Sequence, residues 1–302
     1  MSGDKSNSHI FQSLAVNLAI TVFKGGAAIY TGSGALLAET IHTGADCGNQ
    51  LLLLLGVKQA EKKPDADHPL GYGRSLYFWS FMVALLLFTG GGVFSIYEGI
   101  HKMIHPEDVE NVWVGVAILA FSLLLEGLST LSNIRELNKR RGAVPFFRYL
   151  SETKDSDLIV VFGENAAASL GLFFALAALG LTHVTHDGRY DAAGSLVIGL
   201  ILIGVALFLA REVKSLLVGE SADPNISKQA ADIVVKSPEL NALLNIITIQ
   251  QGPGEVLVAM KVKIESRLTA DQVCEAINAF ERELRSRCPE VKWCFVEPDL
   301  EA

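Results

Sequence analysis

Residues 34–46 read Gly-Ala-Leu-Leu-Ala-Glu-Thr-Ile-His-Thr-Gly-Ala-Asp, which places His42 and Asp46 in one apolar segment long enough to cross a bilayer. A charged side chain near the bilayer centre costs about 2.5 to 3.5 kcal/mol on insertion scales, so such residues usually mark an ion or proton pathway. Residues i and i+4 share one helix face, so an imidazole nitrogen and a carboxylate oxygen can converge on one point. The pair therefore predicts half of a tetrahedral site for a borderline cation such as Zn²⁺. The alternative is a polar pair that only packs two helices together.

The composition around this segment indicates an integral membrane protein. The hydrophobic share is 50% and the mean hydropathy is +0.35, while residues 219–302 are more polar than the rest. We therefore predict a membrane domain over 1–218, an all-α bundle of six transmembrane helices, and a soluble domain over 219–302. Stretches near the length that a spanning helix needs lie at 11–31, 35–57, 77–100, 112–134, 157–182 and 191–210.

The distribution of Lys and Arg predicts the orientation of these spans, because short cytoplasmic loops retain cations that translocated loops lack. With six spans, only Lys102 and Arg189 fall on one side. We expect both termini and the polar domain in the cytoplasm. The amino end is short and lacks a signal peptide, which favours a prokaryotic plasma (inner) membrane over an organelle. The cations on the expected cytoplasmic side are Lys5, Lys58, Lys62, Lys63, Arg74, Arg135, Lys139, Arg140, Arg141, Arg148, Lys154, Arg211 and Lys214.

Residues 219–302 have the pattern of a small α/β domain. Pro224 suits the start of a helix, and Thr269-Ala-Asp-Gln272 resembles a capping box that opens another. Runs rich in Val and Ile flank Gln251-Gly-Pro-Gly254, which is a hairpin-turn signal. The order α-β-β-α-β predicts an open-faced sheet with two helices on one side. The expected elements are a helix at 225–235, strands at 244–250 and 255–264, a helix from 269 to about 288, and a strand at 291–297.

Several function classes are disfavoured by what the sequence contains. The net charge of −8 is spread over both domains and argues against a nucleic-acid partner. No Walker loop is present, so ATP is not expected to drive any transport, and we expect neither an enzyme nor a prosthetic group. The polar domain has no histidine, so a metal site there would need Cys274, Cys288 and Cys294 together. Isolated thiols are the favoured alternative.

Four stretches together resemble the cation diffusion facilitator family of metal-cation/proton antiporters. The resemblance implies six membrane helices, a cytoplasmic ferredoxin-like domain, a homodimer, and a metal site formed by the second and fifth helices. The stretches are Thr-Gly-Ser-Gly-Ala-Leu-Leu-Ala-Glu at 31–39, Asp-His-Pro-Leu-Gly-Tyr-Gly-Arg at 67–74, Tyr-Asp-Ala-Ala-Gly-Ser at 190–195, and Trp-Cys-Phe-Val-Glu-Pro-Asp at 293–299.

The fifth expected span departs from the pattern of the zinc-transporting members that it resembles. Those members carry His-x-x-x-Asp there as well, whereas this chain has Val161 and Asn165 at the two positions. Glu164 is the nearest replacement carboxylate, and Asn165 offers a neutral amide oxygen that suits hard ions better. The Glu-Asn pair resembles the Glu-Asp of the branch that includes the ninth human zinc transporter. The resemblance therefore implies His42, Asp46 and Glu164 as metal ligands, with Asn165 as a weaker one.

Glu126 adds a carboxylate in the fourth expected span, which the family fold brings against the second and fifth. It is either a further ligand or the partner of a cation such as Lys24, because a buried carboxylate needs some partner. Both interpretations stay open.

These observations predict a transporter that exports a divalent cation, with Zn²⁺ favoured by His42, in exchange for protons by alternating access. Ligation needs a neutral imidazole and ionised carboxylates, so metal and protons compete for the same atoms. One alternative is an antiporter of the same family for Mn²⁺, Fe²⁺ or Co²⁺, favoured by the oxygen donors Glu164, Asn165 and Glu126. Another is a non-transporting membrane scaffold or metal-responsive regulator.

Overall fold

The computed structural model describes residues 3–106, 109–152 and 156–299. The chain divides into two compact units, which are taken separately below. One unit comprises residues 1–56 and 78–213, and the other comprises 57–77 and 214–302.

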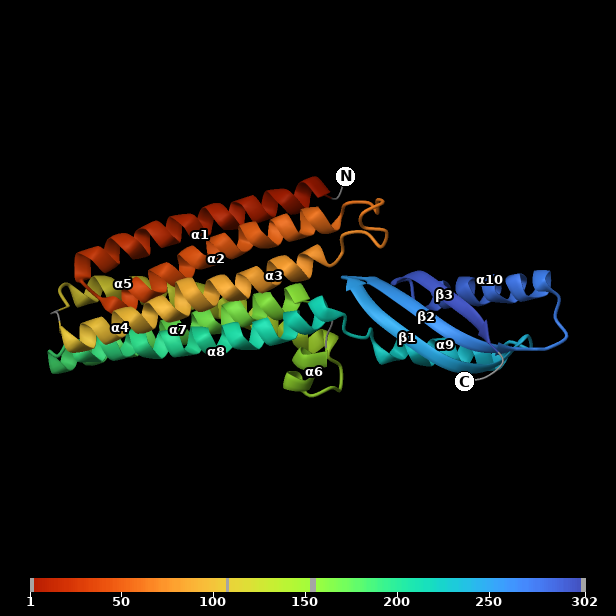
Figure 1. Cartoon of the computed structure of the whole chain (residues 1–302). Coiled ribbons are helices and arrows are strands. Elements are labelled where there is room, and N and C mark those ends of the chain that lie inside the picture. Colours follow the sequence, from red (N-terminus) through yellow and green to blue (C-terminus); the bar gives the residue numbers. More distant parts are fainter. Residues whose placement is uncertain (1–2, 107–108, 153–155, 300–302) are drawn as a thin grey trace. The chain divides into compact units, whose positions relative to one another are not determined.

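Long helices make up the first unit (Figure 1), and α5 contacts both α1 and α7. The segments α3, η1 and α4 follow one another without a break, and η1 is a π-helix. The helices of this part of the chain are α1 (Gly3–Thr31), α2 (Gly34–Ala60), α3 (Ser75–Leu86), η1 (Leu87–Val93), α4 (Phe94–Ile104), α5 (Val112–Arg140), α6 (Phe146–Glu152), α7 (Ser156–Thr185) and α8 (Arg189–Val218).

Four helical segments of the described residues are long and apolar enough to cross a membrane. They are Ser75–Ile104, Val112–Arg140, Val161–Thr185 and Arg189–Val218. The expected helical membrane part is therefore confirmed. The other two expected spans correspond to α1 and α2, which have 29 and 27 residues.

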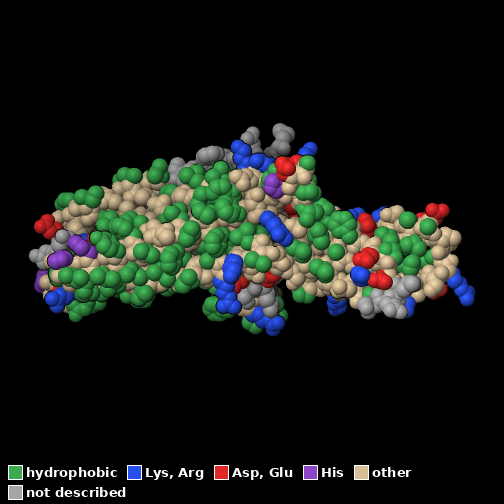
Figure 2. Space-filling model, in the orientation of Figure 1, with side chains coloured by type: hydrophobic (Ala, Val, Ile, Leu, Met, Phe, Trp, Pro, Cys, Tyr) green, Lys and Arg blue, Asp and Glu red, His purple; other side chains and the backbone are tan. Residues whose placement is uncertain are grey.

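Hydrophobic side chains gather over much of the face of the helical unit that Figure 2 shows. Large hydrophobic side chains are strongly exposed on several helices, among them Phe23, Ile29, Phe121 and Phe173. Lipid tails are as apolar as these side chains, so a bundle in a bilayer does not need a polar outer face.

Glycines bring the π-helix and the start of α4 close to α8. A Cβ added at Gly92 would lie 2.5 Å from Ile203 Cγ1, and one added at Gly199 would lie 2.7 Å from Ile96 Cγ1. Small residues allow helix backbones to approach closely in membranes. Neither glycine could be replaced without moving the helices apart.

The second unit contains a three-stranded sheet with the order β1-β2-β3, in which β1 and β2 are antiparallel and β2 and β3 are parallel. Helices α9 and α10 share one hydrophobic core with the sheet, including Ile233, Val258 and Phe280. The element order is the one expected from the sequence. The elements are α9 (Pro224–Lys236), β1 (Leu240–Gly252), β2 (Glu255–Ile264), α10 (Ala270–Arg287) and β3 (Val291–Asp299).

The local signals of this unit act as expected at two helix starts. Thr269 and Gln272 form the capping box of α10, and Asp223 accepts a hydrogen bond from the Asn225 amide to cap α9. The sequence predicts that the first strand begins at residue 244, but β1 begins at Leu240. Register shifts between 240 and 245 let the early residues pair with β2 despite their irregular alternation.

Candidate metal centre

A carboxylate from α8 caps the start of helix α2. Asp191 accepts hydrogen bonds from the Ser33 hydroxyl at 2.6 Å and from the backbone amides of Gly34 and Ala35. The Ser33 hydroxyl in turn accepts from the Leu36 amide at 3.1 Å. The first amides of a helix have no partner within it, so these contacts satisfy them and fix the start of α2 two turns before His42.

His42 and Asp46 lie together on α2, as the spacing predicts. His42 Nε2 is 3.7 Å from Asp46 Oδ2, and the side chains are 1% and 19% exposed. Within the described part of the chain, both ring nitrogens of His42 and Oδ1 of Asp46 are buried without a hydrogen-bond partner. Buried polar atoms are nearly always paired, because an unmade bond costs about 1–3 kcal/mol. The orphaned atoms are nitrogen and oxygen donors of the type that a divalent cation takes.

Glu164 on α7 lies in the same region, where it is hydrogen-bonded to Asn49, a residue that the sequence did not single out. Asn49 Nδ2 donates a 2.6 Å hydrogen bond to Glu164 Oε1, and Asn49 is fully buried. Glu164 also lies within electrostatic reach of Asp46. The helical spacing 42, 46, 49 puts Asn49 on the face of His42 and Asp46, and this signal could have found it.

Glu126 lies near the His42–Asp46 pair, whereas the contact of Asn165 with α5 involves its backbone. Glu126 on α5 is partly buried and within electrostatic reach of Asp46, Lys24 and His42. Asn165 meets α5 through its backbone carbonyl, which accepts a 3.0 Å hydrogen bond from the Thr130 hydroxyl. The expected amide contribution of Asn165 is therefore not tested by this contact.

The structure gathers the expected ligands into one region without closing a coordination shell. Among the residues that the structure describes, no group of three or more His, Cys, Asp and Glu side chains could hold a metal ion as placed. His42 and Asp46 form a pair, and Glu164 is held separately by Asn49.

Lys24 pairs with a different carboxylate from the one considered in the sequence analysis. Its ammonium lies 3.5 Å from Glu39 Oε2 and donates a 3.0 Å hydrogen bond to the Thr43 hydroxyl, and both charged side chains are at most 2% exposed. Glu39 lies against α7, where a Cβ added at Gly171 would clash with Oε1. The sequence did not reveal this pair because its members come from different helices. The Lys24–Glu39 pair leaves Glu126 without this cation as its direct partner.

The cysteines at 274, 288 and 294 do not offer a comparable set of ligands. Cys274 is exposed, whereas Cys288 and Cys294 are buried. Burial raises the pKa of the Cys294 thiol to about 11, and a protonated thiol is a poor ligand. The thiols therefore fit the interpretation of isolated side chains better than that of a metal site.

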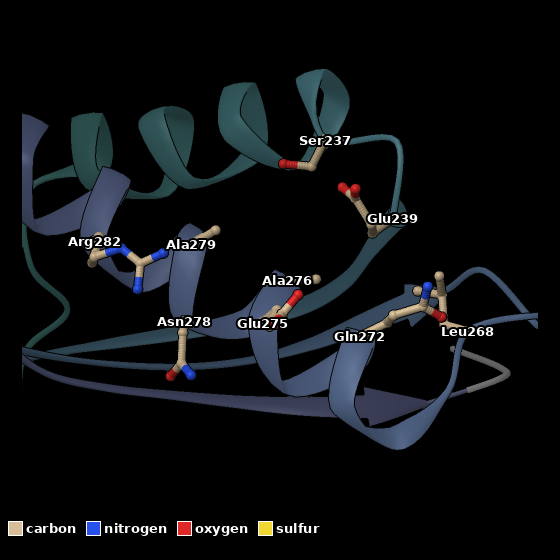
Figure 3. Close-up of a pocket in the computed structure, with 9 residues that line it drawn as sticks. All are labelled: Ser237, Glu239, Leu268, Gln272, Glu275, Ala276, Asn278, Ala279 and Arg282. Carbon is tan, nitrogen blue, oxygen red and sulfur yellow. The ribbon is translucent and has the colours of Figure 1, made fainter.

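A hollow of about 580 Å³ lies between the end of α9 and α10 in this unit. Figure 3 shows Glu239 at one end of the hollow and Arg282 at the other, with Glu275 between them on α10. Acidic and basic side chains are mixed there, so the hollow has no preference for a ligand of one charge. We assign it no function.

Comparison with known proteins identifies the family. The model of the cation efflux transmembrane domain matches residues 10–218, so the chain belongs to the cation efflux (cation diffusion facilitator) family, a family of transporters and not of enzymes. The resemblance seen in the sequence is thereby confirmed.

Individual relatives share moderate identity with this chain. It is 32% identical over 268 residues to the mitochondrial proton-coupled zinc antiporter SLC30A9 of Xenopus laevis, covering 88% of this chain and 48% of that protein. The human counterpart is 31% identical, with 88% and 47% covered. The chain thus spans about half the length of these relatives. The magnetosome protein MamB of Paramagnetospirillum magneticum is 22% identical over 296 residues, with 96% and 93% covered.

Among solved structures, a nickel form of a variant MamM C-terminal domain is similar to part of the chain. The identity is 10% and the TM-score is 0.25, with 26% of this chain and 100% of that domain covered.

Proposed function

We propose that this protein is a zinc/proton antiporter of the cation efflux family. The observation that carries the proposal is the buried His42 and Asp46 pair, whose ring nitrogens and carboxylate oxygen have no hydrogen-bond partner in the described structure. The relatives named proton-coupled zinc antiporters support zinc as the cargo. We propose His42, Asp46 and Glu164 as the principal ligands, with Glu126 and Asn165 as further candidates.

Exchange follows from the chemistry of these side chains. An imidazole nitrogen binds a cation only when it is unprotonated, and a carboxylate binds best when it is ionised. A proton that arrives on His42, Asp46 or Glu164 therefore weakens the hold on the metal, and an arriving metal displaces protons. No three acidic, cysteine or histidine side chains of the described residues form a shell as they stand, so binding of the cargo requires the side chains of α2 and α7 to close around it.

The proposal includes the membrane arrangement. We propose that α1 and α2, with 29 and 27 residues, are the two further spans. Residues 1–218 would then form a six-span membrane domain, and 219–302 a cytoplasmic ferredoxin-like domain. Both termini would lie in the cytoplasm, and the membrane would be a prokaryotic plasma membrane. The excess of Lys and Arg on one side supports this orientation.

We propose a homodimer that uses the helix-free face of the sheet. Ile247, Ala259 and Phe295 lie side by side across the three strands, and Ile247 and Phe295 are 54% and 58% exposed. A row of exposed apolar side chains on a sheet is typical of a surface that another chain covers. Purified protein with the mass of a single copy would contradict this part of the proposal.

A second cargo class is favoured by the donor types. Apart from His42, the candidate ligands Asp46, Glu164, Glu126 and Asn165 offer oxygen, which suits Mn²⁺, Fe²⁺ or Co²⁺ as well as zinc. The open ligand arrangement keeps a third possibility, a membrane scaffold or metal-responsive regulator that does not transport.

A flux measurement tests the proposal. The protein is reconstituted into vesicles that contain a pH-sensitive dye, and Zn²⁺, Mn²⁺, Co²⁺ or Fe²⁺ is added outside. We expect zinc to move protons fastest, and we expect His42→Ala and Glu164→Ala to lower the flux at least about tenfold, since even residues that only support ligands contribute that much. His101→Ala, which removes an exposed helical histidine, is the control. Faster proton movement with another ion would assign that ion as the cargo. No proton movement with any ion would favour the non-transporting scaffold.

A further inference from the structure

Asn49 is a buried amide that joins the two helices of the proposed site. Its Nδ2 lies 2.6 Å from Glu164 Oε1, and its side chain is fully buried on α2. Its Oδ1 is also buried, and it has no hydrogen-bond partner among the residues that the structure describes. One end of this amide therefore contacts an expected ligand, and the other end is unsatisfied.

The orientation of this amide follows from its partner. In the ionised form that binds a cation, the Glu164 carboxylate only accepts hydrogen bonds, so the amide atom that faces it is the nitrogen, as the structure has it. Such a bond to a charged acceptor is short and strong, and it leaves Oδ1 directed elsewhere. Turning the amide around would place two acceptors against each other and would not satisfy Glu164.

Electrostatics shows why Glu164 needs this donor. Asp46 is the charged group whose repulsion acts on Glu164, whereas Asn49 supplies a favourable hydrogen bond. Two carboxylates in a dry region repel each other until a cation joins them. Without the Asn49 amide, Glu164 would be free to turn away from Asp46 before the cation arrives.

We propose that Asn49 is a positioning residue for zinc binding. Its N–H fixes one oxygen of Glu164, so that the other oxygen is presented to the cation held by His42 and Asp46. This inference rests on the proposed function, because it assigns a supporting role within that same site.

The test is zinc binding to the full-length protein in detergent, measured by calorimetry as the binding event that His42→Ala abolishes. Asn49→Leu keeps the size of the side chain and removes the amide. We expect it to weaken this event by about 10–100-fold, the usual effect of losing a group that orients a metal ligand. Asn49→Ser, which is too short to reach Glu164, should weaken it similarly and covers the case in which the leucine variant does not fold. Thr40→Val, which alters a buried hydroxyl of α2 bonded to its own helix, is the matched control and should bind within about twofold of wild type.

A double-variant cycle separates positioning from simple packing. If Asn49 acts through Glu164, adding Asn49→Leu to Glu164→Ala should change the zinc affinity less than about twofold, because coupled residues are not additive. Full additivity, or wild-type affinity in Asn49→Leu and Asn49→Ser, would overturn the inference. Vesicle flux of the wild-type protein decides the proposed function separately. Zinc flux together with additive variants would reject the role of Asn49 and keep the antiporter, whereas absent flux would reject the antiporter itself.

Discussion

At the scale of single residues, Lys24 forms an ion pair with Glu39, and the ammonium neutralises this carboxylate one turn before His42. Both side chains are almost fully buried, and the ammonium also donates to the Thr43 hydroxyl. Removing one partner of a buried pair leaves an uncompensated charge, whereas replacing both with apolar groups is often nearly neutral. Glu39 and Lys24 act on His42 in opposite directions, so the ammonium offsets part of the influence of the carboxylate on the candidate metal centre.

Variants of this pair have an expected order of stability. Lys24→Met should lower the free energy of unfolding by about 3–5 kcal/mol, because Glu39 is left buried and unpaired. Lys24→Met combined with Glu39→Leu should recover most of that loss. Thermal unfolding in detergent, without metal, measures both. A double variant less stable than Lys24→Met would contradict a simple ion pair.

The sequence predicts single-helix features of the site better than features shared between helices. His42 and Asp46 follow from i, i+4 spacing alone, and the structure places them 3.7 Å apart. Asn49 follows the same face, but its role became visible only when α7 placed Glu164 beside it. Lys24 and Glu39 lie 15 positions apart on two helices, and no periodicity within one helix connects them.

At the scale of elements, α2 depends on a cap that comes from α8. Asp191 is 1% exposed and receives the Ser33 hydroxyl and the first amides of the helix. A carboxylate also suits the positive end of a helix. This contact fixes where the helix that carries His42 and Asp46 begins.

Removal of this cap should loosen the start of α2. Asp191→Ala should cost about 1–2 kcal/mol, the range for losing a strong helix cap, and should speed amide hydrogen exchange at residues 34–38. Asp191→Asn, which keeps an acceptor oxygen, should lose less. Asp187→Ala is the control, because Asp187 accepts a hydrogen bond from the Arg189 amide near α8 and is only partly buried. Unchanged exchange at 34–38 in Asp191→Ala would show that another group holds the helix.

Element boundaries were predicted less well than element types. The hydrophobic runs predicted the position of every long helix. Helix α1 nevertheless starts at Gly3 rather than at residue 11, because a polar first segment can extend a helix beyond the part that lipid covers. The π-helix at Leu87–Val93 leaves no hydrophobic signature, because the whole helical segment Ser75–Ile104 that contains it is apolar. Its glycines gave the one local hint.

At the scale of the whole molecule, the chain combines an apolar helical unit of the cation efflux family with a small sheet domain. The structure offers candidate ligands that are near one another and not yet closed around an ion. Cation binding and proton release at one set of atoms give an exchanger without a covalent step. The family resemblance was readable in the sequence from four motifs, whereas the choice of ion depends on distances that only a bound cation would set.

The most direct test of exchange imposes a pH difference and no zinc difference. Vesicles that contain the reconstituted protein are given equal zinc on both sides, and the inside is made acidic. An antiporter lets protons leave down their gradient and carries zinc the opposite way, so we predict that zinc accumulates inside and that His42→Ala abolishes the accumulation. Zinc that stays equal on both sides, while the same vesicles pass zinc down a zinc gradient, would contradict proton coupling and with it the central claim.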